Sequence, residues 1–174
     1  LGMVQLLFKD TGKAADLKKQ AELESIFQLC MTVGGQDLKA DRCSLFLLDA
    51  DSQELYSLVR AQRDVSSESW RADDTEIRMP VTVGIAGHTV AEKKLINTRN
   101  AQHDSRFNNA FDKKTGYVTQ SVLCAPIFDP HGEVMGVIQA MNKTGEDGEG
   151  SGVFTKHDER MMTMLAKHVS LFVK

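Results

Sequence analysis

Cysteine is scarce in this chain, and no stretch of it is strongly apolar or strongly charged. The three cysteines, Cys30, Cys43 and Cys124, are an odd number at unrelated spacings. This excludes a complete intramolecular disulfide framework and the paired spacing of a zinc site. No apolar run approaches the roughly 20 residues that a membrane-spanning helix needs. The net charge of −3 gives no electrostatic case for nucleic acid or an anionic membrane. We therefore expect a domain from a reducing, cytoplasmic setting, with no metal, no cofactor and no nucleic-acid partner.

What remains is the composition of one ordinary domain. The chain has 174 residues, of which 41% are hydrophobic and 26% are charged, so it is long enough to bury a normal core. Residues 1–9 are apolar but short, and Gly12 follows them. We expect residues 1–15 to be the end of a linker helix and residues 16–174 to form a single domain.

Apolar periodicity and turn residues divide the chain into helices and strands. Residues 16–33 and 156–174 carry apolar side chains at helical spacing, which predicts two long terminal helices. Between them we expect a short helix opening at Gly84 and a helical turn at residues 106–111 that breaks at Gly116. The polar stretch around Trp70, residues 65–74, predicts a loop. The predicted strands are residues 42–49, 54–63, 75–81, 95–98, 121–128 and 133–141.

This order of elements predicts the α+β class. Two of the apolar runs flank an Asp-Pro-His-Gly turn, which predicts a β-hairpin covered on both faces. We expect a layer sandwich with a mostly antiparallel central sheet. Long terminal helices should cover one face of this sheet, and short helices and loops should cover the other.

The C-terminal part of the chain carries a spaced signature. Asn142-Lys143 ends the second hairpin strand, and Phe154 precedes a helix start at which Thr155 is a good N-cap and Asp158 occupies the N3 position. With Asp158-Glu159, these residues resemble the NK…F…DE signature of GAF domains in cyclic-nucleotide phosphodiesterases and related adenylyl cyclases. Lys143 and Asp158 could pair and join the strand end to the helix start, and the resemblance implies the same brace rather than a ligand contact.

Several polar residues indicate a small-molecule pocket on the loop face. Gln139 lies within a buried-looking strand and needs a partner, either the backbone of a loop above it or a polar ligand. The Gly84–Gly87 run at a helix start exposes backbone N–H groups where the helix dipole favours an anion. Hydroxyl groups are available on Ser44, Thr115 and Thr119. Together these groups suit a phosphate, a ribose and a base.

The resemblance makes this pocket specific. It implies a cyclic-nucleotide site, to which the matching positions are Ser44, Ile85, Ala86, Phe107, Asn108, Asp112, Thr115, Thr119 and Gln139. Where a cGMP-binding relative carries Phe-Asp on the second strand, this chain has Arg60-Ala61. An acidic side chain accepts from guanine N1–H, whereas arginine only donates and adenine N1 accepts. We therefore expect cAMP to be preferred and cGMP to be second, unless Arg60 points to solvent.

The resemblance implies a regulatory domain, without catalytic residues of its own, that acts allosterically in a cyclic-nucleotide phosphodiesterase. One alternative is a dimerisation or docking domain with no ligand, and the apolar stripes of the terminal helices permit a homodimer. Another is an enzyme such as the GAF-fold reductases of free methionine sulfoxide, in which Cys43 and Cys124 would approach across the sheet. The scattered histidines show no metal spacing and no acid–base pairing.

Overall fold

The central sheet is antiparallel throughout and has seven strands. The computed structural model describes residues 13–64, 66, 69–73, 75–145 and 152–173. Of the linker helix end predicted at residues 1–15, residues 1–12 lie outside the described residues, and residues 13–15 belong to the first described helix. The strand order is β3-β2-β1-β7-β6-β5, and β4 pairs with β2. The strands are β1 (Ala40–Asp49), β2 (Glu54–Asp64), β3 (Ser69–Ala72), β4 (Arg78–Pro80), β5 (Ile96–Thr98), β6 (Val122–Phe128) and β7 (Val134–Lys143).

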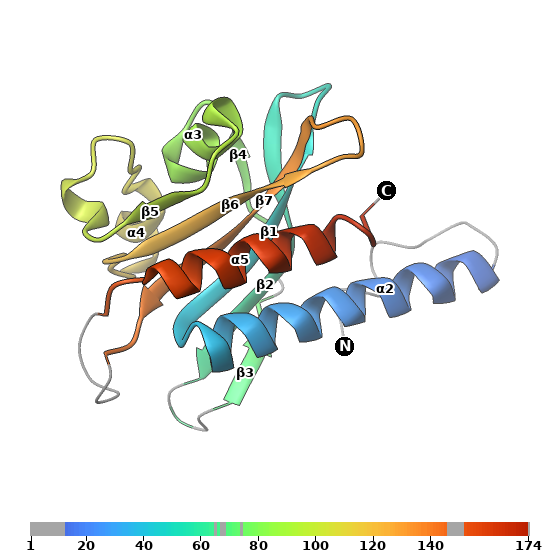
Figure 1. Cartoon of the computed structure of the whole chain (residues 1–174), viewed down its shortest axis with the longest axis horizontal. Helices are drawn as coiled ribbons and strands as arrows, with labels where there is room; N and C mark the ends of the chain where they lie inside the picture. The colour runs from blue at the N-terminus through green and yellow to red at the C-terminus, as the bar shows by residue number, and fades with distance from the viewer. Residues whose placement is uncertain (1–12, 65, 67–68, 74, 146–151, 174) are drawn as a thin grey trace.

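Two layers cover the sheet, as the predicted layer sandwich requires (Figure 1). The helices α2 (Lys13–Met31) and α5 (Lys156–Val169) pack on one face, and a π-helical turn, η1 (Thr32–Asp37), leads from α2 into β1. The other face carries α3 (Gly84–Glu92), η2 (Ala101–His103) and α4 (Ala110–Thr115). The α+β class is confirmed. Among the described residues, no helix is both long and apolar enough to cross a membrane.

Side-chain alternation in β7 divides the core between the two faces. Ile138 and Ala140 belong to the cluster beneath α2 and α5, whereas Val137 belongs to the cluster on the loop face. Strands β1 and β7 approach closely at Gly136, where a Cβ atom would lie 2.4 Å from the carbonyl oxygen of Phe46. This close pairing fixes the register in which Ser44 lies opposite Gln139.

The five signature residues join these layers. The predicted pair is present, with Lys143 Nζ 2.6 Å from Asp158 Oδ2, and Lys143 also donates to the Leu38 carbonyl at 3.0 Å. Thr155 and Asp158 form the expected capping box. Phe154 is buried beside Lys143, and Glu159 accepts a 2.9 Å bond from Asn97. Asn142 faces the other way, accepting from Gln120 N and donating to the Val118 carbonyl.

Three predicted boundaries were wrong at the loop face and sheet edge. The expected loop at residues 65–74 contains the edge strand β3, and its Trp70 packs over Gly35 against the helix-side core. The strand expected at residues 75–81 is reduced to β4. The helical turn expected at residues 106–111 begins later, at α4, because the carboxyl oxygen of Asp104 and the amide oxygen of Asn108 accept from backbone N–H groups two residues on. Such local bonds compete with a helix.

At the C-terminus, α5 ends at Val169, before the predicted residue 174. The Ser170 hydroxyl donates to the Lys167 carbonyl at 2.7 Å, and a turn follows the helix. The predicted break at Gly116 is confirmed, because this residue caps α4 with a left-handed φ of 73°.

Candidate functional site

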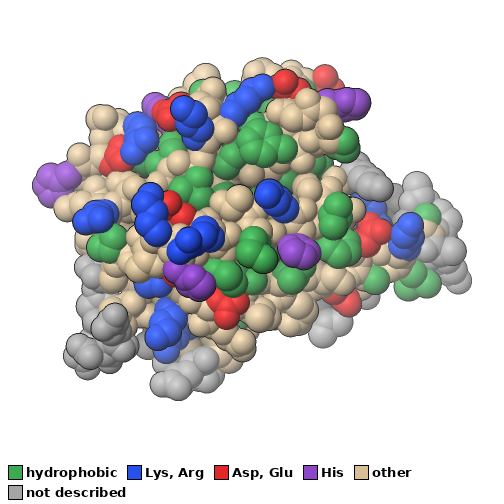
Figure 2. Space-filling view, viewed as in Figure 1, with side chains coloured by type: hydrophobic (Ala, Val, Ile, Leu, Met, Phe, Trp, Pro, Cys, Tyr) green, Lys and Arg blue, Asp and Glu red, His purple; other side chains and the backbone are tan. Residues whose placement is uncertain are grey.

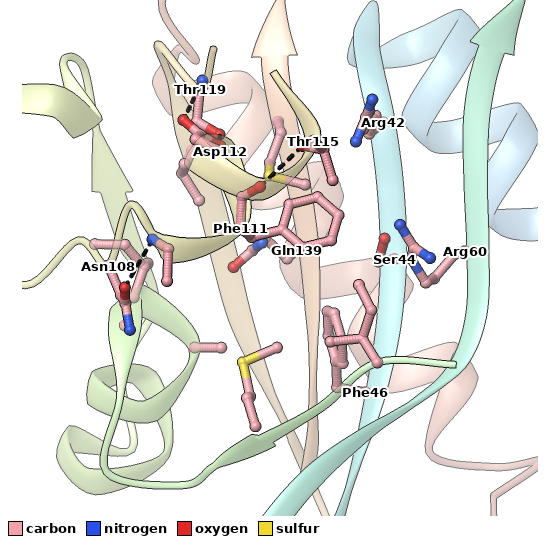
Figure 3. A pocket seen from close by; sticks show the side chains of 18 of the residues that line it. Arg42, Ser44, Phe46, Arg60, Asn108, Phe111, Asp112, Thr115, Thr119 and Gln139 are labelled. Carbon is pink, nitrogen blue, oxygen red and sulfur yellow. Dashed lines mark hydrogen bonds between the residues drawn. The ribbon is translucent and has the colours of Figure 1, made fainter. Parts of the chain in front are cut away.

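A cavity of about 590 Å³ lies between the sheet and the loop layer. Strands β1, β2 and β7 form its floor, α3 lies at one end, and α4 with the loop after it forms a lid (Figure 3). All the residues predicted for a ligand site line this one cavity: Ser44, Arg60, Ala61, Ile85, Ala86, Phe107, Asn108, Asp112, Thr115, Thr119 and Gln139. The predicted residues therefore lie together around one cavity, while their contact with a ligand stays a prediction.

The floor offers polar groups to which no described residue makes a hydrogen bond. Ser44 and Gln139 are paired neighbours on β1 and β7 and face the cavity together. Within the described part of the chain, neither side chain makes a hydrogen bond, so the loop backbone expected as one possible partner of Gln139 is not its partner. An amide and a hydroxyl can each both donate and accept. This part of the floor can therefore form hydrogen bonds with either a donor or an acceptor on a ligand.

The start of α3 presents backbone N–H groups. Its N-cap residue is Val83, which makes no side-chain cap, and Gly84 enters the helix with a left-handed φ of 75°. Ile85 and Ala86 follow, buried against the loop-face core. The uncapped N–H groups of a helix start carry a partial positive charge that favours an anion. The short helix predicted to open at Gly84 is confirmed.

Asp112 holds the lid together through hydrogen bonds. Its carboxylate accepts from the backbone N–H and the hydroxyl of Thr119, both at 2.8 Å, and from Gln102 at 3.1 Å. The hydroxyl of Thr115 donates to the Phe111 carbonyl at 2.9 Å. The protons of both threonine hydroxyls, expected to be offered to a ligand, are thus used within the lid, and Thr115 Oγ1 also accepts from the Tyr117 N–H at 3.3 Å.

Arg60 lies inside the cavity, so the alternative that it points to solvent is wrong. Only 7% of its side chain is exposed, and it pairs with Asp73 at 2.9 Å and donates to the Thr75 carbonyl at 2.7 Å. Burial lowers the pKa of Arg60, and Asp73 opposes that shift. Partial burial would raise the pKa of Asp73, but the Thr75 N–H and the Arg60 guanidinium hold it below its ordinary value. The two groups therefore form an ion pair at neutral pH.

The lining residues that sequence reasoning missed include Arg42, Asp73 and Phe111. Alternation along β1 could have found Arg42, because it lies two residues before Ser44 and so faces the same side. Asp73 and Phe111 lie in the edge loop and the lid, where no periodic pattern indicates direction. Arg42 and Asp73 add charged side chains to a cavity in which the sequence already placed Arg60 and Asp112.

The three cysteines are divided between the two faces of the sheet, with Cys30 next to Cys43 in the helix-side core and Cys124 in the loop-face core. Cys43 and Cys124 belong to the cores on opposite faces of the sheet, so they do not approach each other as the reductase alternative requires. Burial raises the pKa of Cys124 to about 12, and none of the three cysteines lines the cavity. Among the described residues, no group of three or more His, Cys, Asp or Glu side chains is placed to hold a metal ion.

We compared the chain with a family model and with the sequences of known proteins. The family model described as GAF domain matches residues 22–173. The chain is 34% identical over 152 residues to a probable 3',5'-cyclic phosphodiesterase, pde-5, of Caenorhabditis elegans, covering 86% of this chain and 20% of that protein. It is 35% identical over 161 residues to the dual 3',5'-cyclic-AMP and -GMP phosphodiesterase 11A of Takifugu rubripes, covering 91% of this chain and 17% of that protein. The chain thus spans a fifth or less of the length of these relatives.

Solved structures share the fold at lower identity. A GAF domain from a phosphoenolpyruvate-protein phosphotransferase of Coxiella burnetii has a TM-score of 0.64 at 20% identity, covering 90% of this chain and 93% of that chain. A type II free methionine-R-sulfoxide reductase from Thermoplasma acidophilum has a TM-score of 0.67 at 16% identity, covering 90% and 94%. These similarities establish the architecture alone, since the same fold serves different functions.

Proposed function

The chain belongs to the GAF domain family, and on that premise we propose that its cavity binds a cyclic nucleoside monophosphate. The observation that supports this most is the cavity itself, whose volume of about 590 Å³ suits a small ligand. It has the start of α3 at one end, and Ser44, Gln139 and Arg60 towards the other (Figure 3).

One end of the cavity suits the phosphate of such a ligand, and the other end suits its base. A cyclic phosphate carries one negative charge, which the backbone N–H groups at Ile85 and Ala86 can hold together with the helix dipole. A purine base has a flat apolar face with donors and acceptors on its edge. Phe46 on the floor and Phe111 on the lid offer apolar surface, and Gln139 and Ser44 offer both kinds of polar group.

Within this class we propose that cAMP is preferred over cGMP. The Arg60 guanidinium only donates, and bonds to Asp73 and Thr75 hold it at the floor of the cavity while using only part of its five N–H groups. Adenine N1 accepts a hydrogen bond, whereas guanine N1–H donates one. A donor held opposite this edge of the base therefore favours adenine.

Isothermal titration calorimetry with cAMP, cGMP and adenosine tests both statements. We expect cAMP to bind with a dissociation constant of about 10 µM or lower, cGMP to bind more weakly, and adenosine, which lacks the phosphate, to bind weakest. Gln139→Leu should weaken cAMP binding about tenfold, because it removes an unused polar group from the floor. Gln28→Leu, on the exposed face of α2, is the matched control. Absence of heat with both cyclic nucleotides at high micromolar concentration would contradict the proposal.

We further propose that this domain regulates the catalytic part of a longer phosphodiesterase, as the named relatives suggest. Asn142 holds the lid loop through Val118, and the next residue, Lys143, holds α5 through Asp158. A ligand that orders the lid would therefore bias the terminal helices through two adjacent residues. Hydrogen exchange with and without cAMP tests this coupling. Protection limited to the lid, with exchange in α2 and α5 unchanged, would contradict it.

A further inference from the structure

Arg42 lies at the cavity in a fixed position that neither the signature nor the predicted site explains. It is on β1, two residues before Ser44, and lines the cavity beside the lid (Figure 3). Its guanidinium carbon lies 3.5 Å from the centre of the Tyr117 ring, so the cation stacks on that ring. Tyr117 is itself held, because its hydroxyl donates to Asp41 Oδ2 at 2.8 Å. Burial, followed by the nearby Asp41 carboxylate, raises the pKa of Tyr117, so the hydroxyl keeps the proton that it donates.

The guanidinium of Arg42 has N–H groups that no described residue accepts. Among the described residues, no hydrogen bond or ion pair engages its guanidinium. The other two arginines of the cavity differ. Arg60 is bound to Asp73 and Thr75, and Arg78 is bound to Glu76 and Glu54. A guanidinium that lies flat on an aromatic ring keeps its N–H groups free around its edge. Arg42 is thus a positioned donor for which no described residue is the acceptor.

A ligand that fills the cavity would change the surroundings of this donor. Arg42 is half-buried, so water can still reach it. A bound molecule under the lid would displace that water, and a donor left without a partner carries a large penalty. Binding is therefore favoured for ligands that place an acceptor next to Arg42. The residue lies at the Ser44 and Arg60 side of the cavity, away from the start of α3 (Figure 3), and hence away from the end suited to phosphate.

We propose that Arg42 is a specificity-determining residue of this site, which donates a hydrogen bond from its Tyr117 platform to an acceptor atom of the ligand's base. This proposal rests on the proposed binding of a cyclic nucleotide. Tyr117 acts through Arg42 as a positioning residue. Since Tyr117 lies in the loop that follows α4, the donor is in place only while this loop stays against β1.

Calorimetry on Arg42→Met with a series of ligands tests the proposal. The acceptors on the adenine ring are N1, N3 and N7, and 1-deaza-, 3-deaza- and 7-deaza-cAMP each lack one of them. We expect Arg42→Met to weaken cAMP about tenfold or more, with its unfolding midpoint close to that of the wild type. One of the three deaza analogues should lack the nitrogen that accepts from Arg42. For that analogue, the dissociation constants of the variant and the wild type should agree within about twofold.

Further variants separate charge, platform and position. Arg42→Lys keeps the charge but loses the planar stack, so we expect it to recover only part of the affinity, and Tyr117→Leu should behave like it. Arg63→Met removes the same charge from β2 outside the cavity and should bind cAMP as the wild type does. Equal affinity of Arg42→Met and wild type for cAMP would overturn the role of Arg42 while leaving the proposed function intact. The same loss for cAMP and all three analogues would also overturn it, because it would indicate a general charge effect. A wild-type domain that binds no cyclic nucleotide overturns both proposals.

Discussion

A buried ion pair between Lys143 and Asp158 holds the start of α5 against the end of β7. The side chains are 16% and 4% exposed, and the Nζ–Oδ2 distance is 2.6 Å. Lys143→Met would leave the Asp158 carboxylate buried without its cation, so we expect the free energy of unfolding to fall by about 3 kcal/mol. Urea denaturation measures this. Lys156→Met is the control, because Lys156 pairs with Glu159 while 86% exposed, and it should cost less than about 1 kcal/mol. Equal losses in the two variants would contradict the prediction.

Residue positions were predictable from the sequence where the interaction is local. The capping box of Thr155 and Asp158 spans three residues, so its spacing alone indicates it. The partners of Arg60 were not predictable, since Asp73 and Thr75 belong to an edge loop whose path no pattern describes. For the same reason the sequence placed Thr119 in the site but not its bond to Asp112, which depends on how the lid folds back.

At the scale of elements, the buried strands and their hairpin followed from alternation and turn residues, because burial leaves a strong periodic pattern. The edge strand β3 was missed, since it is four residues long and mostly exposed, and its pairing with β2 leaves little apolar signal. The start of α4 was misplaced because Asp104 and Asn108 bond to the local backbone. Thus the sheet and the long helices could be predicted, and the lid could not.

The lid depends on one carboxylate. Asp112 accepts the backbone N–H and hydroxyl of Thr119 and a side-chain N–H of Gln102. Asp112→Ala removes these acceptors, so we expect amide hydrogen exchange at Thr119 to rise about tenfold or more without ligand, while exchange in β7 stays unchanged. Mass spectrometry of peptides covering residues 110–121 measures this. The neighbouring variant Lys113→Ala should leave exchange unaltered, and an Asp112→Ala domain with normal protection would show that other contacts hold the lid.

For the whole molecule, several carboxylates tie stability to pH. Hydrogen bonds from the Arg106 side chain, opposed by partial burial, hold the pKa of Asp104 far below its ordinary value. Hydrogen bonds from the Asn97 and Lys156 side chains lower the pKa of Glu159. The folded state therefore binds fewer protons than the unfolded state in acid, so the stability that Asp104 contributes is complete well above its unfolded pKa of about 3.9 and is lost as pH falls towards its folded pKa.

We therefore expect the urea midpoint to be flat near neutral pH and to fall steadily below about pH 5. Asp104→Asn should lower the midpoint at pH 7 and reduce its fall between pH 5 and pH 3, because the variant has one fewer shifted carboxylate. Asp51→Asn, at an exposed turn, is the control and should keep the wild-type profile. An Asp104→Asn profile parallel to that of the wild type would contradict this account.

Exposed apolar side chains on the terminal helices favour a second copy of the chain as a partner. Met164 on α5 is 54% exposed and Leu171 beyond its end is 67% exposed, while Leu17 on α2 is 67% exposed. Figure 2 shows hydrophobic side chains at the surface of this face of the molecule. We expect a homodimer through the terminal helices, because pairing would remove this surface from water.

Light scattering at several concentrations should give twice the chain mass. The double variant Met164→Glu/Leu171→Glu should give the monomer with little change in the unfolding midpoint, since both residues are exposed within one chain. Val118→Glu, on the lid side and 55% exposed, should stay dimeric. A monomeric wild type, or a double variant that keeps the dimer mass, would show that these helices face water.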